Sequence, residues 1–90
     1  KKNVQVTKEL KMSPKISIHD YNVRLRRATE FLDKKYKVKL TIFFRGREMS
    51  HQDLGFDLVK RFIEDIKESG VPDGDPIRQG RNIVLILIPN

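Results

Sequence analysis

Residues 37–48 read KVKLTIFFRGRE, and the first eight of them decide the fold. Apolar positions recur at every second residue, at Val38, Leu40, Ile42 and Phe44. The intervening positions carry Lys39, Thr41, Phe43 and Arg45. Alternation with this period is typical of a strand that buries one face and leaves the other partly exposed. The segment therefore predicts a strand in a sheet that has one covered face.

Two further strands can be placed on either side of this segment. Residues 3–12 also alternate, which indicates another half-buried strand that Pro14 ends. Leu10 and Met12 share one face and Glu9 and Lys11 share the other, with Lys8 as the exception to the pattern. Residues 83–88 are apolar throughout and end at a proline, which favours a buried strand. A short strand is expected before residues 78–82, although the sequence PDGDP at 72–76 opposes a long one. The RQGRN stretch at 78–82 can form a hairpin loop around its glycine.

Two helices are predicted from apolar positions at helical spacing and from their capping residues. Ser17 is expected to cap a helix over about 18–35. Ser50 is expected to begin a second helix that extends to Glu68. Gly55 lies inside the apolar stripe of the second helix, where glycine costs about 1 kcal/mol relative to alanine. We therefore expect the helix to approach the sheet closely at this residue.

The order of these elements is strand, helix, strand, helix, strand, strand, which predicts an α+β two-layer sandwich. Right-handed crossovers would place both helices on one face of a four-stranded mixed sheet. Ninety residues suffice for a single domain of this β-α-β-α-β-β type. We expect residues 1–90 to form that one domain.

The charge is distributed unevenly along the chain. Residues 1–47 contain 14 Lys and Arg against 4 Asp and Glu, whereas residues 48–76 contain 3 against 8. The net charge of the whole sequence is +7. A basic half with an acidic half favours one surface that binds a polyanion and another held away from it. Nucleic acid is the partner class that this distribution favours.

Enzyme and metal sites are poorly supported by the residue types present. The sequence has no cysteine, and its two histidines, His19 and His51, lack the spacing of metal ligands. Neither histidine has a serine arranged as a nucleophile. We therefore predict no catalytic residue, no metal and no cofactor, with a small enzyme using one histidine kept as a remote alternative. A second alternative is a basic adaptor domain that binds a protein through acidic residues of the second helix, such as Glu64 and Asp65.

A basic cluster follows the central strand. Arg45 and Arg47 flank Gly46, which lacks a side chain that would keep a ligand away from the backbone. Guanidinium groups match phosphate oxygens in pairs, so this segment is a candidate phosphate contact. Phe43 either covers the edge of the core or stacks on an unpaired base, and the sequence leaves both open. The sequence contains neither the aromatic strand motif of RRM domains nor the GXXG loop of KH domains.

Two motifs in the right order connect the chain to a known family. HDYNVRLRRATEFL at 19–32 is followed by KVKLTIFFRGREMSHQDLG at 37–55. Together they closely resemble the C-terminal domain of bacterial translation initiation factor three, and the resemblance covers nearly the whole chain. It implies a sheet with two helices on one side and no catalysed reaction. It also implies binding to ribosomal RNA of the small subunit, exclusion of the large subunit, and indirect support of start-codon selection by initiator tRNA.

The resemblance also implies which residues contact RNA. The basic positions of the family fall on Lys11, Arg24, Arg26, Arg45, Arg47, Arg61 and Arg81, with Gly46 between two of them. Three positions depart from the pattern, because Ser13 and Phe43 stand where a basic residue is common in the family, and Glu30 stands where some members carry one. Arg26 also lies four residues before Glu30, so the two side chains can pair along the helix.

The resemblance implies a wider context for the domain. In the family an N-terminal domain and a lysine-rich linker precede it, and Lys1 and Lys2 are expected to be the end of that linker. The expected location is the bacterial cytoplasm, or the matrix or stroma of an organelle for an organellar form. A monomer without membrane contact is expected.

Overall fold

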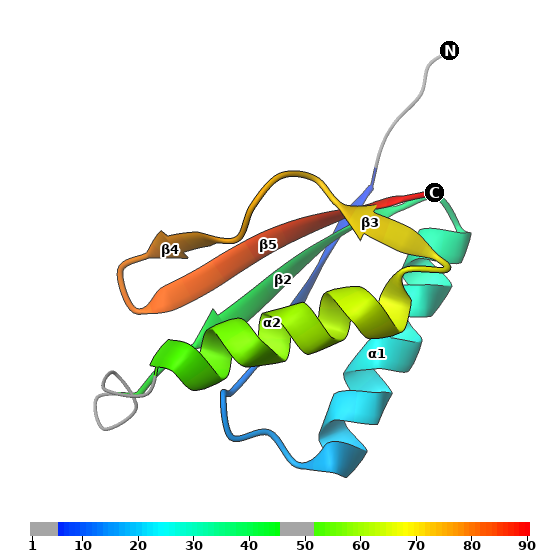
Figure 1. Cartoon of the computed structure of the whole chain (residues 1–90). Coiled ribbons are helices and arrows are strands. Elements are labelled where there is room, and N and C mark those ends of the chain that lie inside the picture. Colours follow the sequence, from blue (N-terminus) through cyan, green and yellow to red (C-terminus); the bar gives the residue numbers. More distant parts are fainter. Residues whose placement is uncertain (1–5, 46–51) are drawn as a thin grey trace.

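The structure, a computed structural model, describes residues 6–45 and 52–90 (Figure 1). In chain order its elements are β1 (Thr7–Met12), α1 (Ile18–Asp33), β2 (Lys37–Phe43), α2 (Gln52–Ile66), β3 (Gly70–Pro72), β4 (Ile77–Gln79) and β5 (Asn82–Pro89). Both helices lie on one side of the sheet, with α2 crossing in front of the strands (Figure 1). The predicted α+β sandwich is therefore confirmed. Both helices end about two residues before their predicted ends.

The sheet is mixed and follows the order β1-β2-β5-β3, with β4 also paired to β5. β1 runs parallel to β2, and every other pair is antiparallel. Leu87 of β5 pairs with Val38 on one side and with Pro72 on the other, so β3 occupies the edge of β5 that faces away from β2. Val84 is likewise paired on both sides, which places β4 on that same edge.

The sheet thus has five strands where four were predicted, because its outer edge strand is divided in two. Residues 73–76, between β3 and β4, include Gly74 at a φ of 93° and Pro76, which has no N–H to donate. One backbone hydrogen bond, from the Asp73 N–H to the Ile86 carbonyl at 2.7 Å, continues the pairing at the break. The expectation of a short third strand is confirmed, and the extra strand is its continuation.

The predicted capping residue of α1 is present. The Ser17 side chain accepts a hydrogen bond from the Asp20 N–H at 3.2 Å, which satisfies one of the free donors at the helix start. The predicted cap of α2 at Ser50 lies outside the described residues. Gly55 of α2 is buried where an added Cβ would lie 3.0 Å from Ile83 Cδ1 and closer still to the Phe44 ring. The expected close approach of α2 to the sheet is confirmed.

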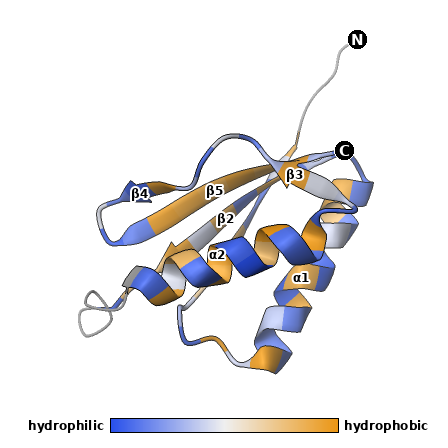
Figure 2. Cartoon of the chain, viewed as in Figure 1, coloured by the Kyte–Doolittle hydropathy of each residue, from blue (hydrophilic) through white to orange (hydrophobic). Residues whose placement is uncertain are grey.

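The core lies between the sheet and the two helices. Alternate residues of β2 and β5 are fully buried there and meet Phe62 of α2 and Leu32 of α1: Val38, Leu40, Ile42, Ile83, Leu85 and Leu87. β5 is hydrophobic over most of its length, since the residues on its other face are also apolar (Figure 2). Those residues, Val84, Ile86 and Ile88, are half-buried on the face that the helices leave uncovered. Lys8, the exception to the alternation of β1, lies 5.9 Å from the ring centre of Phe31 and 5.7 Å from that of Tyr36.

Candidate nucleic-acid interface

One end of the sheet gathers cationic residues from segments far apart in sequence. The carboxyl ends of β1 and β2 and the start of β5 meet there, because Met12 pairs with Ile42 and Phe43 pairs with Asn82. The Phe44 N–H donates to the Arg81 carbonyl at 3.0 Å, which brings the segment after β2 beside the β4–β5 turn. Arg45 and Arg81 are both exposed at this end.

The β4–β5 turn is the predicted hairpin around Gly80. Gln79 pairs with Asn82, so two residues connect the strands, and Gly80 has a φ of 58° that glycine adopts without strain. Because Arg81 is the second residue of this turn, the turn determines its position at the end of the sheet. The two other residues of the predicted basic cluster, Gly46 and Arg47, lie outside the described residues.

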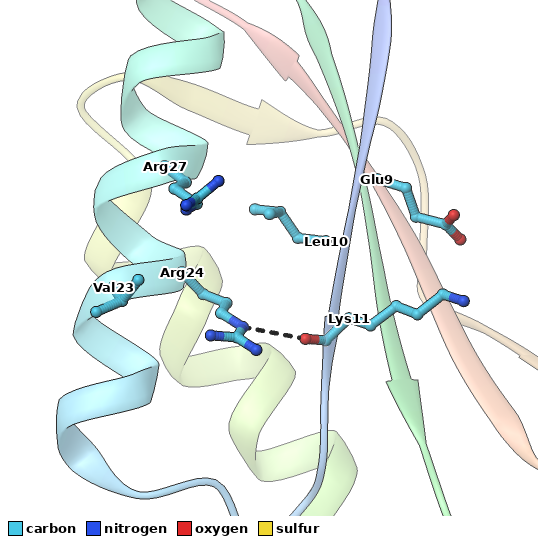
Figure 3. A pocket seen from close by; sticks show the side chains of 6 residues that line it. All are labelled: Glu9, Leu10, Lys11, Val23, Arg24 and Arg27. Carbon is cyan, nitrogen blue, oxygen red and sulfur yellow. Dashed lines mark hydrogen bonds between the residues drawn. The ribbon is translucent and has the colours of Figure 1, made fainter.

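A groove with a volume of about 340 Å³ lies between β1 and α1 (Figure 3). Arg24 of α1 spans it, and its Nε–H donates to the Lys11 carbonyl at 3.2 Å. The Lys11 side chain points away from α1, as does that of Glu9 (Figure 3). Arg24 therefore contacts the backbone of Lys11, while the Lys11 ammonium lies on the face of the sheet that the helices leave uncovered. The lining residues are Glu9, Leu10, Lys11, Val23, Arg24 and Arg27.

The other predicted cation of α1 is not part of this groove. Arg26 is exposed and does not line the groove, and the described residues record no ion pair between it and Glu30. Arg27, which the sequence interpretation did not select, reaches into the groove instead (Figure 3). The signal for Arg27 was its spacing of three residues from Arg24, which places both on one side of a helix.

Arg61 of α2 is engaged within the protein. Its guanidinium lies 4.9 Å from the centre of the Tyr21 ring, and its Nε lies 3.8 Å from Asp65 Oδ2. The Tyr21 hydroxyl donates to the same carboxylate oxygen at 2.7 Å. Burial of Tyr21, together with this hydrogen bond to Asp65, raises the pKa of its hydroxyl well above the ordinary value. Arg61 thus shares the Asp65 charge, and less of its own field reaches outward.

Comparison with known proteins identifies the family. The family model for the C-terminal domain of translation initiation factor IF-3 matches residues 5–90. The translation initiation factor IF-3 of Leptospira biflexa is 45% identical over 89 residues, which are 99% of this chain and 48% of that protein. The chain belongs to the IF-3 family.

Other IF-3 relatives give the same result. Those of Caldanaerobacter subterraneus and Xanthobacter autotrophicus are 44% and 42% identical, each over 99% of this chain and over 49% and 51% of their own length. The chain thus spans about half the length of the curated relatives that it matches. The family resemblance drawn from the two sequence motifs is confirmed.

Phe43 of β2 stands where the family resemblance leads us to expect a cation. It lies opposite Asn82 on the face that the helices leave uncovered, and its side chain is half-buried. The ring therefore has an accessible part, and its stacking on a base stays a prediction.

Neither a metal-binding cluster nor a membrane-spanning helix occurs in the described parts of the chain. No group of three or more His, Cys, Asp or Glu side chains that could hold a metal ion is found among the described residues. No helix in these ranges is both long and apolar enough to span a membrane. His19 is exposed in the first turn of α1, and His51 is outside the described residues.

Proposed function

We propose that this domain binds ribosomal RNA of the small ribosomal subunit with the cationic end of its sheet. The observation that carries the proposal is the gathering of Arg24, Arg45 and Arg81, from three separate segments, around the ends of β1, β2 and β5. Membership of the IF-3 family supplies the ribosomal context. Lys11 extends this surface, and Arg47 and Gly46 are assigned to it from the sequence. Arg26 lies outside the groove that Arg24 spans and is assigned no phosphate contact, and Arg61 contributes less because Asp65 offsets its charge.

The binding would be driven largely by release of counterions from the RNA. Each phosphate that a cation neutralises contributes about 0.7–0.9 to the slope of log affinity against log salt concentration. About five contacts would give a slope of roughly −3 to −5. Because the contacts are to phosphates, the domain would recognise the shape of folded RNA more than its sequence.

The consequence for translation is competition at the surface of the small subunit. A bound domain that occupies a surface needed by the large subunit prevents subunit joining by mass action. Support for start-codon and initiator tRNA selection would act indirectly, through the small subunit. In this account the domain is a cytoplasmic monomer that catalyses no reaction, and in the whole protein it follows an N-terminal domain and linker.

The adaptor alternative has less support than RNA binding, because the two acidic residues of α2 assigned to it already contact other residues of the chain. Glu64 of α2 pairs with Lys67, which follows the last residue of the helix. Asp65 contacts both Tyr21 and Arg61. Both carboxylates therefore already have partners inside the chain. An acidic docking face would have to break these contacts.

Paired replacements at opposite ends of the molecule test the proposal. Arg45→Ala with Arg81→Ala removes two cations from the proposed interface, and Lys34→Ala with Lys67→Ala removes two exposed cations that follow the helices. Affinity for purified small subunits would be measured at several salt concentrations. We expect the arginine pair to lose at least tenfold in affinity and to flatten the salt slope by about 1.5, while the lysine pair changes affinity less than about threefold. Equal losses in the two variants would refute the assigned surface.

A further inference from the structure

The groove between β1 and α1 has features of a binding site beyond the presence of Arg24. Leu10, 8% exposed, forms its apolar floor, and Val23 is a half-buried wall. β1 pairs only with β2 among the described strands, so the groove follows a free edge of the sheet. Two guanidinium groups from successive turns of α1 reach into this space (Figure 3).

Arg24 is held in a fixed orientation inside the groove. Its Nε–H donates a hydrogen bond to the Lys11 carbonyl at 3.2 Å. A guanidinium has five N–H donors in one plane. The four N–H groups on its two terminal nitrogens are therefore left to bind a ligand. A cation whose plane is already set loses less conformational entropy when it binds an anion.

The electrostatic surroundings of the two groove arginines differ from those of Arg61, which lies beside Asp65. Within residues 6–45 and 52–90, no ion pair involves Arg24 or Arg27. The Glu9 carboxylate lies on the other side of β1, 4.0 Å from Lys39 Nζ, and points away from the groove (Figure 3). Two guanidinium groups beside one cavity, neither of them in an ion pair recorded for the described residues, give a positive potential that favours an anion.

We propose that this groove binds a backbone phosphate of RNA between Arg24 and Arg27. The proposal rests on the proposed function and adds a residue, Arg27, to the RNA contacts. Guanidinium groups bind phosphate oxygens in pairs, and two of them on one phosphate contact both free oxygens. A groove of about 340 Å³ also holds the adjoining sugar, which packs on Leu10 and Val23.

An acidic peptide is the competing occupant, because the free edge of β1 could accept an added strand. Backbone pairing with such a strand would need the Lys11 carbonyl as an acceptor. Arg24 already occupies that carbonyl, so the peptide would first have to break this hydrogen bond. A phosphate needs only the free guanidinium donors, and the geometry therefore favours RNA.

The groove assignment predicts different losses of RNA affinity for replacement of Arg26 and of Arg27, although the two residues are sequence neighbours. Residues two apart on a helix face different directions, whereas residues three apart share a side. Arg27 accordingly lines the groove with Arg24, and Arg26 does not. The same change of charge at the two positions should have different effects on RNA binding.

The experiment compares Arg27→Ala with its matched control Arg26→Ala, and adds Arg27→Lys. Alanine favours helices and both side chains are exposed, so both variants should fold, which circular dichroism would verify. Affinity for purified small ribosomal subunits would be measured across a range of salt. We expect Arg27→Ala to lose about tenfold and its salt slope to fall by about 0.7–0.9, because one charged contact is removed. Arg26→Ala should lose less than about twofold, and Arg27→Lys should recover the slope but only part of the affinity.

An equal loss in both alanine variants, or no loss in Arg27→Ala, would overturn the groove assignment. If the unmodified chain does not bind the small subunit, the proposed function fails, and the groove is then tested separately. The Nε–H signals of Arg24 and Arg27 would be followed by NMR while a short RNA duplex or a glutamate-rich peptide is added. Shifts of both signals with RNA alone support the phosphate site. Shifts with the peptide alone, or with neither ligand, refute it.

Discussion

The hydrogen bond between Tyr21 and Asp65 should make the stability of the domain depend on pH in a defined range. Tyr21 is 3% exposed and its hydroxyl donates to Asp65 Oδ2 at 2.7 Å, which joins α1 to α2. Hydrogen bonds to charged groups contribute about 1.5–3 kcal/mol. Because the Asp65 side chain is 37% exposed, water can replace part of this contact. We therefore expect Tyr21→Phe to lower the free energy of unfolding by about 1 kcal/mol at pH 7.

The pKa of Tyr21 is raised in the folded protein, mainly by burial and then by the bond to Asp65. A group whose pKa is raised on folding stabilises the protein fully below its unfolded pKa, which is about 10 for tyrosine. Above that pH the unfolded chain loses this proton first, so the stabilisation falls by about 1.4 kcal/mol per pH unit. The stability difference between wild type and Tyr21→Phe should therefore vanish near pH 11 and then change sign.

Urea denaturation followed by circular dichroism, from pH 7 to about pH 11.5, would measure this difference. Tyr36→Phe is the matched control, because Tyr36 has no hydrogen-bond partner for its hydroxyl among the described residues. That control should change stability by less than about 0.5 kcal/mol at pH 7. A Tyr21→Phe difference that stays constant above pH 10 would refute the role given to the hydroxyl.

Three further outcomes follow from individual contacts. Gly55→Ala should lower the free energy of unfolding by about 1 kcal/mol, because crowding against Phe44 outweighs the gain in helix propensity. Thermal denaturation would measure this loss, and a variant more stable than wild type would contradict the close packing of α2 on the sheet at Gly55. Gly80→Ala should lower the free energy of unfolding by about 1 kcal/mol, because residue 80 has a φ of 58°, and Gly80→Asn should lower it less. Equal stability of wild type and the two variants in urea would rule out this backbone effect. Arg61→Ala should weaken small-subunit binding less than about twofold, since Asp65 already offsets that charge; a tenfold loss would show that Arg61 acts as a full contact.

The secondary structure could be predicted where several residues repeat one pattern. Alternation in 38–44 and a capping serine at Ser17 define elements whose structure depends mainly on local sequence. β4 could not be predicted as a strand separate from β3, because its three residues are all exposed and too few to show a period. It exists only because the edge of β5 remains free after the break at 73–76.

The binding surface was harder to predict because charge counting does not give direction. The alternation of β1 already placed Lys11 with Glu9, away from the helices, which the structure confirms (Figure 3). The engagement of Arg61 depends on Tyr21, which lies in another helix, and no local pattern reveals it. Arg27 was missed because the side of α1 that faces β1 is determined by tertiary packing.

The central claim is that the cationic end of the sheet holds the domain on the small subunit and so keeps the large subunit away. The most direct test is light scattering of purified small and large subunits mixed with increasing amounts of the domain. The account predicts that wild type reduces subunit association in a dose-dependent and salt-sensitive way, and that the Arg45→Ala, Arg81→Ala protein requires at least tenfold more to do so. Undiminished association with saturating wild-type domain, or equal inhibition by the variant, would contradict it.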